Sequence, residues 1–369
     1  MKLIILRENL KEALSRVERA VTENNNLPVL RNILLSAENQ LFVSATNLEL
    51  GVRSQAAAKI NQKGSLTIPF APLYSIVVNS TSERINLEAE KETLVVKTDN
   101  YEAKIQGTKA EEFPILPNIK DRNSFISIQF SILKDTLEQV SPAAQISDLK
   151  PELSGVLFDF QVGQIKFVAT DSYRLAEKSL LNTSFNSTQK EAVRAIVPLT
   201  TIQELLRVFN EDEEIKIFLD ETQILFESEK SYLISRLIDG EYPDYQAIVP
   251  KEHNVEFTIE KTDFFNALKL VNSFSGRTND VRLKLASNEK ALELYASNQS
   301  VGENNYLVPV KKEGETFEPT SFNARYLIDG LRIIRAETIL LQSNGPTKPV
   351  LIKPSGDKSF FYIVMPLES

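Results

Sequence analysis

The sequence predicts an α+β fold of three similar domains, each with two helices packed on a mostly antiparallel sheet. This prediction depends on the length of 369 residues, on one order of elements that occurs three times, and on the short β-rich runs between the helices. At roughly 100 to 200 residues per domain, the length fits two or three domains that need no disulfide or metal for stability. We place the domains at residues 1–120, 121–250 and 251–369.

Each third begins with a short alternating strand that leads into an amphipathic helix. The apolar residues of these helices recur at i, i+4 and i+7, which places them on one helical face. They are Leu10, Leu14 and Val17, then Leu133, Leu137 and Val140, and finally Phe264, Leu268 and Val271. Such triplets also occur in unrelated helices, so it is their constant order and spacing that favours a repeat.

A second helix is predicted in each third, starting near Pro69, Pro198 and Asn323. A pair of strands then closes each third, at residues 93–105, 223–237 and 349–366. Because short strand-like runs dominate between the helices, the sheets should be antiparallel.

The composition excludes several kinds of site. The chain has no cysteine and one histidine, His253, so disulfides, thiolate metal sites and paired imidazoles are excluded. No phosphate-binding glycine loop, zinc-protease motif or nucleophile elbow is present. We interpret Glu211–Glu214 as a solvated turn and His253 as a surface side chain. The sequence therefore predicts a protein that is not an enzyme, with no catalytic residue, cofactor or metal.

The charge is unevenly distributed. Lys and Arg number 42 against 50 Asp and Glu, which gives a formal net charge of -8. The excess of acidic residues lies in the middle third, so the average does not exclude nucleic acid as a partner. The first residues lack a signal-peptide core and no window is apolar enough to span a membrane, so we expect a cytoplasmic protein without membrane contact.

Three segments stand out, in a fixed order along the chain. They read ATDSYRLA at residues 169–176, DGEYPDYQAIVP at 239–250 and IVMPLES at 363–369. Taken singly they indicate a hairpin turn, a proline-stiffened linker and a core strand. Taken together, with three similar domains, they resemble the β sliding clamp family of bacterial DNA polymerase III over the whole chain.

The resemblance implies the DNA clamp fold, in which two subunits join head to tail into a ring dimer. It implies a processivity factor that encircles double-stranded DNA independently of sequence, in the cytoplasm near the nucleoid. The partners would be the DNA polymerase III catalytic subunit, the clamp loader and repair proteins, bound through short QLxLF-like peptides. The expected peptide pocket comprises Leu153, Thr170, Ser172, Tyr173, Arg174, Leu175, Pro243, Ile248, Pro346, Val364, Met365, Pro366 and Leu367.

The same resemblance assigns residues to the DNA and to the dimer interface. The expected DNA-facing residues are Lys11, Arg16, Arg19, Asn24, Lys134, Lys150, Arg207, Lys269, Asn323, Arg325, Tyr326, Arg332 and Arg335. The expected interface residues are Ile105 on one side and Val271 and Phe274 on the other.

The chain departs from the family pattern at three places. Ser172-Tyr173 replaces a Gly-His pair, Glu368-Ser369 replaces an Arg-Leu end, and Glu23–Asn26 occupies a loop that often offers an arginine to DNA. These changes favour weaker DNA contact and a variant peptide. Two alternatives to the ring remain, a monomeric three-domain adaptor and a specialised clamp paralogue. A third is a hydrolytic enzyme that uses Asp159 and Asp171.

Overall fold

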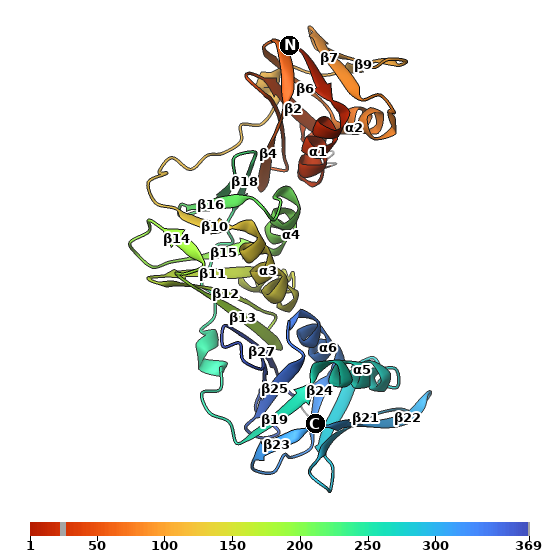
Figure 1. Cartoon of the computed structure of the whole chain (residues 1–369), viewed down its shortest axis with the longest axis vertical. Helices are drawn as coiled ribbons and strands as arrows, with labels where there is room; N and C mark the ends of the chain where they lie inside the picture. The colour runs from red at the N-terminus through yellow and green to blue at the C-terminus, as the bar shows by residue number, and fades with distance from the viewer. Residues whose placement is uncertain (23–26, 368–369) are drawn as a thin grey trace. The chain divides into compact units, whose positions relative to one another are not determined.

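The computed structural model describes residues 1–22 and 27–367 (Figure 1), and the chain divides into two compact units. Unit 1 comprises Met1–Lys134, Phe185–Gln189 and Thr200–Leu237. Unit 2 comprises Asp135–Ser184, Lys190–Leu199 and the chain from Ile238 onward. The middle third of the sequence therefore contributes to both units.

The predicted helices are confirmed, two in each third of the chain. Within the described residues they are α1 (Arg7–Val17), α2 (Phe70–Asn79), α3 (Phe130–Val140), α4 (Leu199–Val208), α5 (Lys261–Asn272) and α6 (Ala324–Ile333). All nine residues of the predicted apolar triplets are fully buried. Among the described helices, none combines the length and the apolar character needed to cross a lipid bilayer.

Unit 1 contains a nine-stranded and a five-stranded sheet. The nine strands, in spatial order, are β14 (Phe185–Ser187), β10 (Ile126–Gln129), β16 (Glu214–Leu219), β17 (Gln223–Glu227), β18 (Ser231–Arg236), β4 (Leu50–Ala56), β3 (Leu41–Thr46), β2 (Asn32–Ala37) and β6 (Gly64–Pro69). The five are β5 (Ala58–Gln62), β1 (Lys2–Leu6), β7 (Arg84–Glu90), β8 (Thr93–Lys97) and β9 (Glu102–Gln106).

Unit 2 repeats this plan with a nine-stranded and a four-stranded sheet. The nine strands are β15 (Val193–Pro198), β11 (Gly155–Gln161), β12 (Gln164–Thr170), β13 (Arg174–Leu181), β27 (Phe360–Val364), β26 (Val350–Pro354), β25 (Thr338–Ser343), β19 (Val255–Glu260) and β23 (Lys311–Gly314). The four are β22 (Gly302–Pro309), β21 (Ala291–Asn298), β20 (Asp280–Leu285) and β24 (Thr320–Asn323).

Each nine-stranded sheet joins strands from different thirds of the sequence. In unit 1, β18 pairs with β4, and Leu233 lies opposite Val52. In unit 2, β13 pairs with β27, and Ala176 lies opposite Tyr362. Both ladders are antiparallel, as the sequence predicted for the sheets in general. The second ladder brings the end of the chain beside the 169–176 segment.

Candidate functional site

The turn between β12 and β13 is held rigidly by its own side chains. The Thr170 hydroxyl donates to the Arg174 carbonyl over 2.6 Å and accepts from the Ser172 amide over 3.2 Å. The Asp171 carboxylate accepts from the amides of Tyr173 and Arg174 over 2.9 and 3.0 Å. Ser172 has a φ of 79°, in the left-handed region where a glycine is least strained. The serine therefore occupies a position whose backbone suits the glycine of the family pattern.

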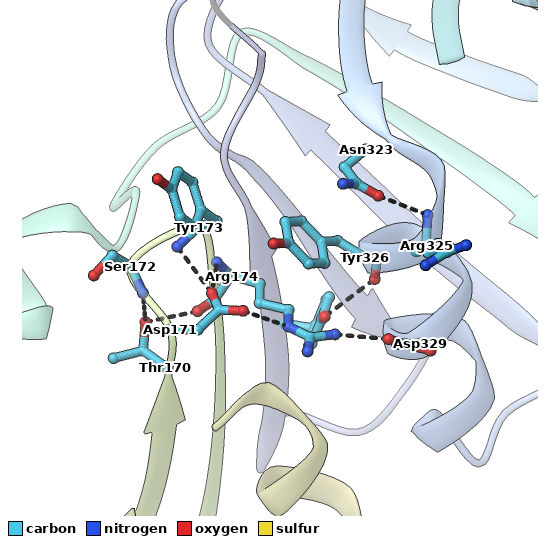
Figure 2. Close-up of polar contacts among 10 residues, drawn as sticks. Thr170, Asp171, Ser172, Tyr173, Arg174, Asn323, Arg325, Tyr326 and Asp329 are labelled. Atoms are coloured by element: carbon cyan, nitrogen blue, oxygen red, sulfur yellow. Dashed lines mark hydrogen bonds and ion pairs between the residues drawn. The ribbon is translucent and has the colours of Figure 1, made fainter. Parts of the chain in front are cut away.

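Arg174 connects this turn to helix α6 (Figure 2). Its guanidinium pairs with Asp171 over 2.9 Å and with Asp329 of α6 over 2.7 Å, and it lies 4.7 Å from the Tyr326 ring centroid. Burial opposes the charge of Arg174, but Tyr362, Asp329 and Asp171 outweigh this effect and raise its pKa. Arg174 is thus a fixed cation between two elements.

Two tyrosines form the exposed side of this site. The rings of Tyr173 and Tyr326 stack with centroids 6.4 Å apart and an interplanar angle of 20°, and Tyr173 is 60% exposed (Figure 2). The Tyr326 carbonyl accepts a hydrogen bond from the Tyr362 hydroxyl over 3.0 Å. We call the residues Thr170–Arg174, Tyr326 and Asp329 the turn cluster.

Two residues assigned to the DNA-facing set make contacts within the chain. Tyr326 lies in the turn cluster, with its ring against Tyr173 and Arg174. The Asn323 side chain caps α6 by accepting from the Arg325 amide over 2.9 Å (Figure 2). Tyr326 and Asp329 are three residues apart and share a helical face, but this spacing does not identify their partners in the distant turn.

The terminal segment lies along the turn cluster. The Met365 amide donates to the Tyr173 carbonyl and the Leu367 amide donates to the Ser321 carbonyl, each over 2.8 Å. Met365, Pro366 and Leu367 are each partly exposed. Lys150, expected on the DNA-facing side, donates from its ammonium to the Ser172 hydroxyl over 3.1 Å.

The remaining residues of the expected pocket fall into two groups. Leu175 and Val364 are fully buried, and Leu153 and Thr170 nearly so. Leu175 belongs to an apolar core with Ile363 and Tyr245, because it points inward from its strand. In the unliganded chain, Leu175 and Val364 thus contribute to the floor beneath the expected pocket, and their role as ligand contacts stays a prediction. The accessible members are Ser172, Tyr173, Pro243 and Ile248, with Pro346 partly exposed.

Arg16, expected to face DNA, is only 7% exposed in this structure. Its guanidinium donates to the Ser231 hydroxyl over 2.6 Å and pairs with Glu12 and Glu213 over 2.8 and 3.4 Å. These partners already use the Arg16 guanidinium, so its expected contact with DNA stays a prediction that the structure makes less favourable. Glu213 also shows that Glu211–Glu214 is more than a solvated turn, and within the described residues no acidic group forms a metal site.

Five predicted DNA-facing cations lie on helices or at their ends and are at least partly exposed: Lys11, Arg19, Arg207, Lys269 and Arg325. Beside Arg19 and Arg207, burial raises the pKa of Glu204, although the two arginines act in the opposite direction. Three others form ion pairs within the chain: Lys134 with Glu211, Arg332 with Asp329, and Arg335 with Asp135 and Glu138. Asn24 lies outside the described residues.

The expected dimer contacts are also only partly accessible. Val271 is fully buried on the inner face of α5, because its position in the apolar triplet turns it inward, and its role at the interface stays a prediction. Ile105, on the edge strand β9, is nearly buried, whereas Phe274 is half-buried. Leu270, which is not among the expected contacts, is 56% exposed, and its carbonyl accepts from the Asn304 side chain of edge strand β22.

Known proteins resemble this chain over its full length. Models of the DNA polymerase III beta subunit match its N-terminal domain at residues 1–117, its central domain at 127–244 and its C-terminal domain at 246–368. The beta sliding clamp of Synechococcus elongatus is 31% identical, with 100% of this chain and 99% of that protein covered. That of Bacillus subtilis is 24% identical, with both chains fully covered.

Solved structures agree in fold. The DNA polymerase III subunit beta of Pseudomonas aeruginosa is 27% identical and has a TM-score of 0.92. The match covers 100% of both chains. The sliding clamp of the same organism bound to griselimycin gives the same identity and coverage and a TM-score of 0.94.

Proposed function

Because the chain belongs to the DNA polymerase III beta subunit family, we propose that two copies close head to tail into a ring around double-stranded DNA. The chain has the role of a sliding clamp in DNA replication. The three domains of the proposed ring subunit span residues 1–120, 121–250 and 251–369. The ring would act as a processivity factor without enzymatic activity, in the cytoplasm at the replicating DNA.

The observation that carries the proposed ring is that two sheet edges lie in opposite units of the chain and could pair with each other in a dimer. Strand β9 ends the five-stranded sheet of unit 1, and strand β22 ends the four-stranded sheet of unit 2. An unpaired edge invites further strand pairing, and a head-to-tail dimer would join β9 of one protomer to β22 of its partner. Leu270, Phe274 and the exposed Leu307 supply apolar surface beside the second edge.

DNA would be held by charge and by closure of the ring rather than by base recognition. The cations of the helices are spread over the chain and include Lys11, Arg19, Arg207, Lys269 and Arg325. Such a distribution suits phosphates and offers no compact element for reading bases. The polymerase catalytic subunit, the clamp loader and repair proteins would dock by QLxLF-like peptides at the turn cluster and the Met365–Leu367 segment.

The griselimycin-bound clamp of Pseudomonas aeruginosa supports the presence of a ligand site in this family. In this chain, the fixed backbone of the turn cluster and the exposed Tyr173 provide a preorganised surface for such a ligand. We place the peptide there because Tyr173, Met365 and Leu367 are joined by backbone hydrogen bonds to rigid elements.

Two measurements on the purified protein test this function. Light scattering should give twice the 41.6 kDa mass of one chain, because the edges are closed in the dimer. After loading onto a circular template, the protein should be retained until the circle is linearised and should then slide off. A monomer at micromolar concentration favours the three-domain adaptor, and equal retention on linear and circular DNA contradicts topological holding.

A further inference from the structure

Arg335, just after helix α6, is held by two carboxylates of helix α3. One guanidinium nitrogen lies 2.8 Å from the Asp135 carboxylate and the other lies 3.2 Å from that of Glu138. The two acids are three residues apart, so they share one face of α3 and receive the two arms of a single arginine. All three side chains are about half exposed.

Ion pairing recurs among the cations assigned to the DNA. Lys134, also on α3, pairs with Glu211 over 2.6 Å, and the last-turn residue Arg332 of α6 pairs with Asp329 over 3.5 Å. Figure 1 shows α3 and α6 on the same side of the nine-stranded sheet of unit 2. Carboxylates therefore accompany the cations on the surface that, under the proposed function, would meet the duplex.

Such pairs contribute little to folding. Exposed ion pairs typically stabilise a protein by about 0 to 1 kcal/mol, because water and salt screen them. Their effect on the affinity for DNA is greater. A phosphate that approaches Arg335 must displace two carboxylates and then remain near their negative charge. Fewer effective phosphate contacts mean weaker binding and a shallower dependence on salt.

We propose that Asp135 and Glu138 restrain Arg335 from the DNA phosphates and thereby keep the contact between the ring and the duplex weak. This inference rests on the proposed function, in which DNA passes along the helices. A closed ring stays on DNA by topology, so a weak contact does not reduce retention and lets the ring slide. The two acids would be part of the sliding surface and would tune its affinity.

The test measures equilibrium binding to a short linear duplex by fluorescence anisotropy between 50 and 200 mM salt. Asp135→Asn with Glu138→Gln should tighten binding about two- to fivefold at the lowest salt, and the slope of log K against log salt should steepen by about 0.9. Adding Arg335→Gln should remove this gain. An equal gain with and without Arg335, or no gain at all, overturns the proposal.

Two controls separate this mechanism from simpler effects. Glu88→Gln with Glu289→Gln removes the same charge from ion pairs with Lys2 and Lys312, and these positions lie outside the helices. If this pair tightens binding as much as the α3 pair, net charge is the cause and the proposal fails. Retention on circular DNA, measured for the same proteins, reports on the proposed ring independently of the salt slope.

Discussion

Arg16 shows that the burial of a side chain can differ from expectation even where its helix is predicted correctly. The sequence places it in an amphipathic helix, at a position outside the apolar triplet, and this suggests a solvated side chain. In the structure its guanidinium is buried, and its hydrogen bonds are completed by Ser231 and Glu213. These partners are distant in the sequence, at separations of 215 residues for Ser231 and 197 for Glu213. No local pattern contains these partners. The stacking of Tyr326 on Tyr173 could not be predicted for the same reason, since Tyr173 comes from a distant turn.

Tyr232 carries a prediction at the residue scale. Its hydroxyl donates to the carbonyl of Pro117, the last residue of the N-terminal family-model match. Burial raises the pKa of Tyr232 to about 12, although Arg122 acts in the opposite direction. A phenol with a raised folded-state pKa stabilises the fold below its unfolded value near 10, and this contribution is lost as the pH rises towards 12.

Tyr232→Phe should therefore be less stable than the wild type at pH 8, by about 1 kcal/mol for the missing hydrogen bond. The difference should narrow by pH 11, because only the wild type has this phenol to ionise. Urea unfolding at the two pH values measures both quantities. A difference that stays constant or widens contradicts the assignment, and the titration of lysines is common to both proteins.

At the scale of elements, the helices could be predicted because their signals are local. Spacing of i, i+4 and i+7 identified the buried faces of α1, α3 and α5 without any knowledge of their partners. The pairing of β18 with β4 and of β13 with β27 could not be predicted in this way, because period-two alternation does not specify a distant partner strand. The same limit applies to the burial of two residues of the expected pocket, since alternation alone did not reveal that Leu175 and Val364 point inward.

The terminal segment carries a prediction at this scale. Deleting residues 365–369 removes the exposed side chains beside the turn cluster but leaves β27, which ends at Val364, paired with β13. Affinity for a QLxLF-like peptide should fall at least tenfold, since about two buried apolar anchors at 1.5 to 3 kcal/mol each lose their surface. The melting temperature should change by only a few degrees, because about two backbone hydrogen bonds are removed.

Fluorescence anisotropy with a labelled peptide and a thermal melt of the same sample provide the measurement. Deletion of residues 368 and 369 alone is the matched control and should leave peptide affinity within about twofold. Unchanged affinity after the longer deletion would remove this segment from the proposed peptide site.

For the whole molecule, the central question is how the free edges of the sheets are covered. Leu270 is 56% exposed beside β22, where the proposed partner would pack. Leu270→Asp should weaken the dimer at least tenfold, because burying a carboxylate against the apolar surface of the partner is unfavourable. Val162→Asp is the matched control, since Val162 is 84% exposed between β11 and β12 and is not at either proposed edge.

Light-scattering mass across a dilution series compares the two variants with the wild type. We expect Leu270→Asp to dissociate into monomers at concentrations where Val162→Asp and the wild type remain dimeric. If both variants retain the mass of the wild type, the dimer interface lies elsewhere on the protein.

The two long sheets have a consequence for cleavage of the chain. Two segments lie between the family-model matches, near residues 118–126 and 245. Backbone ladders join the parts of the chain on either side of them: β4 with β18 across the first, and β13 with β27 across the second. A protease that nicked either segment would break the covalent chain but not these hydrogen bonds or the cores beneath them. The fragments should stay together as a noncovalent complex. The subunit could therefore be produced as two separate polypeptides that reassemble.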